Sequence, residues 1–330
     1  MLCFVGALLA LSPYPKLGLA LNVPEGGGQD AYLVAMRQQV RLGLDGGTIS
    51  VKWDEIAQSG TKPLSDGIGG ATFMGQKVLL TIATIDTVKR RLPPSLMGAG
   101  WDDPGLQRQF DGLLEGLSPI VKGHISWLSL GNEVNPYLTA HPQEQAPYLR
   151  FLAHSRGTVH RLLPGVGVGV TATCTDAMQD PALAKRLQQG MDATVFTYYT
   201  LQGLNPGGSL RTEGDFSFME QVAGARPLLL QEIGCPASPR AGSSEEIQAR
   251  FVQEVFEQLD RNASTVQLAV FFMQCDFSKS AVAVLTGYYG LDQAPFAAFL
   301  GSLGLRDATG KPRKAWDVFA AACMKRKPIE

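Results

Sequence analysis

Short runs rich in Val, Ile and Leu alternate with longer amphipathic stretches along almost the whole chain, and this alternation limits the folds open to it. A short apolar run is typical of a buried strand, and a longer stretch with apolar residues three or four positions apart is typical of a helix packed on a sheet. The strand-like runs number eight: 17–22, 48–52, 77–82, 125–130, 166–171, 193–198, 227–231 and 266–273. The helical stretches between them are 30–42, 106–121, 145–163, 181–189, 215–223 and 244–259.

Strands that alternate with helices pair in parallel, and eight such units close into a (β/α)₈ barrel. The alternative, a doubly wound open sheet, normally has the spacing G-x-G-x-x-G after its first strand. The first turn here, 24–30, contains three consecutive glycines without that spacing. We therefore predict an α/β fold, with one (β/α)₈ TIM barrel that occupies residues 16–330.

The first residues form an apolar run, 1–11, that has about the length of the apolar core of a signal peptide and is too short to span a bilayer. Its start carries no Lys or Arg. The segment 1–15 is therefore interpreted either as a signal peptide or as an apolar segment packed on the barrel. A signal peptide would make the protein secreted or periplasmic. No later segment has the pattern of a membrane span.

Two of the predicted strands lead into a glutamate. Glu133 follows the run 125–130, and Glu232 directly follows the run 227–231. A carboxylate at the edge of an apolar core loses several kcal/mol of hydration, so it is normally paired, hydrogen-bonded or used in chemistry. The carboxyl ends of all strands in a barrel meet at one mouth, where active sites lie. We therefore expect both glutamates to face the same pocket.

The residues around these glutamates resemble those of the clan A glycoside hydrolases, a group of retaining (β/α)₈ enzymes with cellulase-, mannanase- and endogalactanase-like families. Asn132-Glu133 is similar to the acid/base motif at strand four of the clan, and Gln231-Glu232 is similar to its nucleophile strand. Tyr198-Tyr199 ends strand six, where clan members place a tyrosine near the nucleophile. The closing segment 304–316 is also similar. The resemblance does not identify a family within the clan.

The resemblance implies that the chain hydrolyses O-glycosidic bonds, in β-linked poly- or oligosaccharides, by double displacement. Two carboxyl groups serve that reaction, one as nucleophile and one as acid and base. The nucleophile would be Glu232 and the acid/base Glu133, with Asn132 contacting a sugar hydroxyl. A tyrosine that donates to Glu232 would favour its charged form. Tyr199 is expected in this role, and Tyr198 stays the alternative because a slip of one residue exchanges the two faces of a strand.

Three strand ends differ from the clan pattern. The segment 271–276 lacks the tryptophan that clan members usually have at strand eight, strand two ends in Ser50, Lys52 and Trp53 in place of an arginine, and strand six lacks the histidine of the usual His-x-Tyr. A catalytically silent barrel that binds glycan or acts as an assembly component is therefore the alternative function.

Aromatic and polar residues at other strand ends are candidates for binding sugar rings and hydroxyl groups. The substrate-binding residues expected from these positions are Trp53, Asp86, Tyr137, Gln274 and Asp276. Further aromatic candidates are Trp101, Tyr288 and Tyr289. Loop packing or capping is the alternative for each of them.

Charge and cysteine content argue against several other functions. The 29 basic and 30 acidic residues balance, and neither forms a long run, so no nucleic-acid partner is expected. Metal-binding spacings are missing, and we expect neither a metal nor a cofactor. The five cysteines do not suggest a disulfide framework. Cys235 and Cys275 either form a bridge or remain buried thiols. The expected partner is a carbohydrate substrate, and the expected state is a monomer.

Overall fold

The computed structural model of the protein describes residues 14–199, 201–202, 205–206, 210–291 and 293–327. Most of the predicted N-terminal segment 1–15 lies outside the described residues, so its interpretation as a signal peptide or a packed segment stays a prediction. No helix in the described part of the chain is long and apolar enough to cross a membrane.

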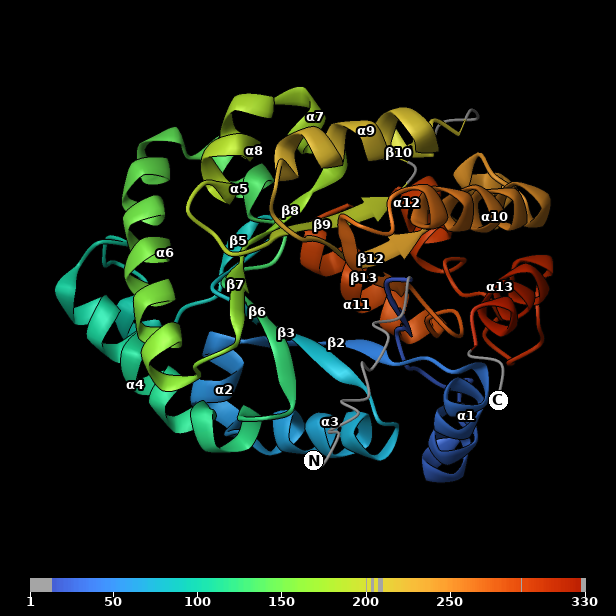
Figure 1. The fold of residues 1–330 in the computed structure, drawn as a ribbon, viewed down its shortest axis with the longest axis horizontal. Coiled ribbons are helices and arrows are strands. Elements are labelled where there is room, and N and C mark those ends of the chain that lie inside the picture. The colour runs from blue at the N-terminus through green and yellow to red at the C-terminus, as the bar shows by residue number, and fades with distance from the viewer. Residues whose placement is uncertain (1–13, 200, 203–204, 207–209, 292, 328–330) are drawn as a thin grey trace, which may run out of the picture.

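Parallel strands form a barrel with helices around it (Figure 1). The strands are β1 (Lys16–Leu19), β2 (Gly46–Lys52), β3 (Lys77–Ala83), β6 (Ile125–Ser129), β7 (Gly167–Gly169) with β8 (Thr171–Thr173), β9 (Thr194–Tyr199), β12 (Leu228–Gly234) and β13 (Val266–Phe271). Every pairing between these strands is parallel. The predicted (β/α)₈ fold is thereby confirmed.

The barrel consists of two hydrogen-bonded arcs, β2-β3-β6-β7 and β1-β13-β12-β9-β8. At one junction, a Cβ atom added to Gly18 of β1 would lie 2.6 Å from the carbonyl oxygen of Gly46 in β2, so the close approach of these strands requires glycine. At the other junction the predicted strand 166–171 is interrupted at Val170. Its first half, β7, pairs with β6, and its second half, β8, pairs with β9. The prediction of one continuous fifth strand was therefore wrong.

Helices surround the barrel (Figure 1). Their bounds are α1 (Gly28–Leu42), α2 (Trp53–Ser59), α3 (Lys62–Phe73), α4 (Pro104–Val121), α5 (Val134–Ala140), α6 (Pro142–Leu162), α7 (Cys174–Gln179), α8 (Pro181–Gln188), α9 (Thr212–Ala223), α10 (Glu245–Arg261), α11 (Lys279–Tyr289), α12 (Ala294–Leu300) and α13 (Lys314–Lys325). All six predicted helical stretches correspond to helices. Side chains cap the start of two of them: Asp180 accepts from the backbone N–H of Leu183, and Ser244 accepts from the backbone N–H of Ile247.

Apolar side chains fill the barrel interior below the mouth. Leu79, Val195, Leu229, Leu268 and Val270 form this inner cluster, and all are buried. Larger clusters fill the space between the strands and the surrounding helices. A filled interior leaves only the carboxyl ends of the strands open to a ligand.

Several short elements that the sequence analysis did not predict extend the loops. A hairpin of β4 (Ile85–Asp86) and β5 (Lys89–Arg90) follows β3, and another of β10 (Leu201–Gln202) and β11 (Asn205–Pro206) follows β9. Short 3₁₀ helices are η1 (Pro94–Leu96) and η2 (Pro239–Ala241). The helices α11 and α12 follow β13. Their apolar faces join a cluster that includes Phe296 and Phe299 and packs against Tyr199 and Phe272, so they lie over the barrel near the two glutamates.

Candidate active site

Glu133 follows a tight turn at the end of β6. It has φ 49° and ψ 49°, a left-handed conformation that is uncommon for a residue with a side chain. The turn begins at Gly131, where an added Cβ would lie 2.5 Å from the Tyr148 hydroxyl. A hydrogen bond to the β4–β5 hairpin holds the turn: the backbone N–H of Asn132 donates to the carbonyl of Ile85 at 2.9 Å. Strain of this kind is frequent at functional sites.

A bulge in β12 determines where Glu232 points. The pairing with β9 skips Gln231, since Leu230 lies opposite Phe196 and Glu232 lies opposite Thr197. A bulge lets two consecutive side chains point to the same side of a strand. Gln231 and Glu232 consequently both contribute to the mouth of the barrel.

Both glutamates are held by hydroxyl donors. For Glu133, Thr87 donates to Oε2 at 2.6 Å and Thr197 donates to Oε1 at 2.7 Å. For Glu232, the Tyr199 hydroxyl donates to Oε2 at 2.5 Å. Thr197 is also the residue that lies opposite Glu232 in the β9–β12 pairing. The two carboxyl groups, 99 positions apart in the sequence, therefore share one mouth.

Burial raises the pKa of both carboxyl groups. For Glu232, burial is the largest cause and the negative charge of Glu133 is the second, and together they raise its pKa to about 7 against the donors Tyr199 and Gln231. For Glu133, burial raises the pKa, and the hydroxyl groups of Thr87 and Thr197 oppose that rise. Because the charge of Glu133 raises the pKa of Glu232, the two carboxyl groups titrate as a coupled pair.

A hydrogen-bond network fixes Asn132 beside the pair. Its Oδ1 accepts from Gln231 Nε2 at 2.8 Å, and its Nδ2 donates to Asp86 Oδ1 at 2.9 Å. Gln231 Oε1 in turn accepts from Thr81 and Thr171, both at 2.7 Å. These bonds settle which end of each amide is the donor and leave the site little rotational freedom.

The structure brings together Glu133, Glu232, Asn132, Tyr199 and Asp86 of the residues expected at the site. Tyr198 lies on the other face of β9: its side chain is buried, and its hydroxyl donates to Asp215 at 3.0 Å. The tyrosine that bonds Glu232 is therefore Tyr199.

Three aromatic residues expected to bind sugar are part of the core instead. Trp53 is 3% exposed and packs edge-on against Phe110. Tyr137 is stacked on His141, and its hydroxyl donates to Glu144 at 2.9 Å. Trp101 is fully buried and donates to the same Glu144 at 2.7 Å. A ring enclosed by protein cannot offer its face to a sugar, so these predictions were wrong.

Two polar residues expected to bind hydroxyls also serve packing. Gln274 is buried, where it accepts from Gln39 and donates to Gln38, both at 3.0 Å. Asp276 forms a two-pronged ion pair with Arg313 at 2.8 and 2.6 Å and accepts from the Gly304 amide. The acceptor and donor groups of these side chains already have protein partners, so the expected role in substrate binding was wrong.

Cys235 and Cys275 are both buried, and no bridge joins them. Among the described residues, no three side chains of His, Cys, Asp or Glu are arranged to hold a metal ion.

Thr87 and Thr197 were not anticipated, although both contact Glu133. Thr197 stands two positions before Tyr199, where the clan pattern has histidine. That position could have indicated from the sequence that Thr197 lies at the site. Thr87 lies in the β4–β5 hairpin with φ 50°, and no periodic pattern indicates it. Tyr288 and Tyr289, expected only as general aromatic candidates, also reach the site. Tyr288 donates to Asp86 Oδ2 at 2.9 Å.

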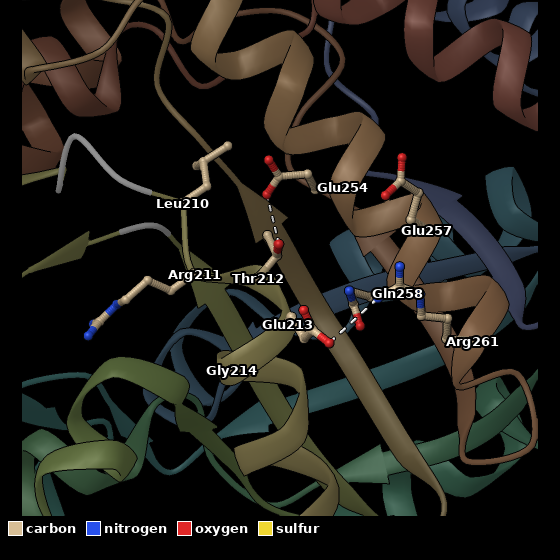
Figure 2. Close-up of a pocket in the computed structure, with 9 residues that line it drawn as sticks. All are labelled: Leu210, Arg211, Thr212, Glu213, Gly214, Glu254, Glu257, Gln258 and Arg261. Atoms are coloured by element: carbon tan, nitrogen blue, oxygen red, sulfur yellow. Dashed lines mark hydrogen bonds and ion pairs between the residues drawn. The ribbon is translucent and has the colours of Figure 1, made fainter.

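A second depression lies between α9 and α10 on the outside of the barrel (Figure 2). Two of its acidic residues have partners, since Thr212 donates to Glu254 at 2.8 Å and Arg261 pairs with Glu213 at 3.8 Å. Its lining residues take no part in the network around Glu133 and Glu232.

Glycoside hydrolases are among the solved structures that match this chain. A variant of GH5_18 from Bifidobacterium longum subsp. longum, in complex with Manβ1-4GlcNAc, matches with a TM-score of 0.73 and 17% identity over 94% of this chain and 78% of its own. An exo-β-1,4-mannosidase from Opitutaceae bacterium strain TAV5 matches with a TM-score of 0.74 and 15% identity, over 95% and 60% of the two chains. Xylanase 10B from Thermotoga maritima matches with a TM-score of 0.66 and 13% identity, over 96% of both.

No family model matches the sequence, and neither does any curated protein sequence. Identities this low establish the shared (β/α)₈ fold and leave the chemistry to be argued from the site.

Proposed function

We propose that the protein is a retaining glycoside hydrolase in which Glu232 is the nucleophile and Glu133 is the acid and base. The observation that carries the proposal is the convergence of two half-buried carboxyl groups at one barrel mouth, both in contact with β9 through Thr197 and Tyr199. The similar folds of known glycoside hydrolases support it.

The reaction has two displacements. In the first, the Glu232 carboxylate attacks the anomeric carbon while Glu133 gives its proton to the departing glycosidic oxygen. This forms a covalent glycosyl ester and leaves Glu133 ionised. In the second, Glu133 takes a proton from water, the water oxygen attacks the anomeric carbon, and Glu232 leaves as a carboxylate. Both side chains return to their starting protonation states.

The protonation that this cycle requires fits the site. With raised pKa values, the pair holds one proton near neutral pH. The Tyr199 hydroxyl donates to Glu232 and favours its charged form, which the proposed role of nucleophile requires. Asn132, fixed by Asp86 and Gln231, is proposed to contact a hydroxyl of the sugar that is attacked.

β-Linked oligosaccharides are the proposed substrate class. The similar structures include a GH5_18 protein in complex with Manβ1-4GlcNAc, an exo-β-1,4-mannosidase and a xylanase. A panel of 4-nitrophenyl β-glycosides therefore starts with mannose, glucose, N-acetylglucosamine and xylose.

Trapping with an activated 2-fluoro β-glycoside, followed by peptide mapping, tests the assignment. The fluorine slows both displacements and the activated leaving group restores the first, so the ester accumulates on the nucleophile. We expect the label on the peptide that contains Glu232, and no label on a Glu232→Gln variant. A label on another residue would contradict the assignment.

A catalytically silent barrel is the second candidate function, because the segment 271–276 lacks the tryptophan of the clan pattern and Thr197 stands where that pattern has histidine. Binding of oligosaccharides in calorimetry, without turnover of any glycoside in the panel, would favour this function. We also propose that the segment 1–15 exports the protein and that it acts as a monomer. N-terminal sequencing of secreted protein and sedimentation analysis test these two proposals.

A further inference from the structure

The helix α11 connects two distant parts of the barrel mouth. It belongs to the loop after β13, the eighth strand, and its last residues contact the β4–β5 hairpin, which follows the third strand. The Tyr288 hydroxyl donates to Asp86 Oδ2 at 2.9 Å, and Lys89 Nζ donates to the Tyr288 carbonyl at 2.7 Å. Side chain and backbone of Tyr288 are both attached to the hairpin.

This connection runs past the end of β2, the second strand, which lies next to the third in the barrel. Lys52, the last residue of β2, places its Nζ 5.6 Å from the centre of the Tyr288 ring. The loop after β1 is held against the loop after β13, because the Cys275 amide donates to Asn22 Oδ1 at 2.8 Å. We call the group of Tyr288, Asp86, Lys89 and Lys52 the end wall.

The end wall is joined to the network of the two glutamates. Asp86 accepts from Tyr288 with one oxygen and from Asn132 with the other. The neighbouring Tyr289 is packed in the same apolar cluster as Tyr199. Burial and the negative charges of Glu133 and Asp86 raise the pKa of Tyr289, which agrees with a hydroxyl placed beside the pair. An element held at so many points is a fixed boundary of the site.

A glycosidase that cuts within a chain needs a cleft that is open on both sides of the bond it breaks. Here one side is bounded by the end wall, directly beside Asn132. Under the proposed function Asn132 contacts the sugar that Glu232 attacks, so the wall lies on the side of that sugar and the leaving group departs in the other direction.

We infer that the site accepts one sugar residue at the non-reducing end of its substrate, and that the end wall around Tyr288 imposes this exo action. The inference rests on the proposed function, and it adds the position of cleavage, which the two glutamates alone do not determine.

The test uses β-1,4-linked manno- and xylo-oligosaccharides of up to five residues, labelled at the reducing end. Each is supplied with a free non-reducing end and with that end capped by a 4-O-methyl group. We expect the full chain to shorten the uncapped substrates one residue at a time, and to cleave the capped ones at least about 100-fold more slowly. Early release of fragments from the middle of the chain, or equal rates with and without the cap, would overturn the inference.

The variant Tyr288→Ala removes the central side chain of the end wall. We expect the ratio of uncapped to capped rates to fall below about 10-fold in this variant, and to stay at its original value in Tyr32→Ala, which removes an exposed tyrosine of α1. An unchanged ratio in a folded Tyr288→Ala protein would assign the restriction to another element.

Absence of turnover with every substrate would count against the proposed function instead. Calorimetry with the same capped and uncapped oligosaccharides then decides about the end wall, because recognition of a chain end requires binding that the cap abolishes. Equal binding of both forms, or no binding of either, overturns the inference.

Discussion

Replacing Glu232 by glutamine should make the stability of the protein less dependent on pH. The pKa of Glu232 is about 7 in the folded protein, and an ordinary glutamate has 4.5. That difference corresponds to about 3 kcal/mol, at 1.36 kcal/mol per pKa unit. The coupling with Glu133 distributes protons over both groups, so we expect a gain of at most this size.

The sign follows from proton linkage. A carboxyl group with a raised pKa in the folded state binds its proton more tightly there than in the unfolded chain. The contribution of Glu232 to the free energy of unfolding is therefore fully present below about pH 4.5 and is lost as the pH rises through 7. Glutamine has no such proton. The variant should match the parent near pH 4 and exceed it by up to about 3 kcal/mol at pH 8.

Urea unfolding at pH 4, 6 and 8 measures this difference, and thermal unfolding gives a second estimate. For a chain of this length, an unfolding entropy of about 2 cal/mol/K per residue converts 3 kcal/mol into about 4 to 5 °C in Tm. The matched control is Glu25→Gln at an exposed loop position, where we expect a change within about 0.5 kcal/mol at every pH. A Glu232→Gln variant whose advantage does not grow between pH 4 and pH 8 would refute the electrostatic account of the site.

Three further variants separate the roles of neighbouring side chains. Tyr199→Phe removes a hydrogen-bond donor to the Glu232 carboxylate, an interaction of about 1.5 to 3 kcal/mol. The pKa of Glu232 should therefore rise, and the acidic limb of the pH profile of kcat/KM should move up by about one to two pH units. An acidic limb that does not move would contradict this. Tyr198→Phe, its neighbour on the opposite face of β9, should keep kcat/KM within about twofold and lose about 1 to 2 kcal/mol in urea unfolding, and a large loss of activity there would mean that the two faces are assigned wrongly. Thr197→Val removes a donor to Glu133, so the alkaline limb should move up by about one pH unit; a shift of the acidic limb instead would exchange the assignments of the two glutamates.

The sequence was sufficient to predict the barrel and the glutamates because both depend on local patterns. Apolar runs and amphipathic stretches have the periods of strands and helices, and the carboxyl ends of parallel strands meet at one place whatever the loops do. The sequence could also predict Tyr199 over Tyr198, because side chains alternate between the two faces of β9 and only one of the two tyrosines lies on the inner face. The bulge at Gln231 was not, because it depends on the register with the neighbouring strands.

The predicted sugar-binding aromatics failed for a physical reason. A large ring at a strand end has two ways to lose its contact with water, by covering a ligand or by covering the protein, and the sequence does not distinguish them. Trp53 packs on Phe110, and Trp101 packs on Tyr148 and Phe151. Of the aromatic candidates for sugar binding, those that do reach the site are Tyr288 and Tyr289 of α11. The contact of α11 with the β4–β5 hairpin joins positions about 200 residues apart.

The donors around the glutamates explain why this pair can keep a proton at neutral pH. In the described part of the chain, the side-chain hydrogen bonds to Glu133 and Glu232 come from two threonines, a tyrosine and a glutamine, all of them uncharged. A cationic partner would depress the pKa of a buried carboxyl group, as opposite charges do, and would leave both groups ionised. Hydroxyl donors instead orient the oxygens while burial keeps the pKa values high. Thr197 is another uncharged donor of this kind. The histidine that the clan pattern has at this position becomes positively charged near neutral pH. A site built this way holds one proton for a leaving group and one negative charge for attack, which a retaining glycosidase needs before its substrate arrives.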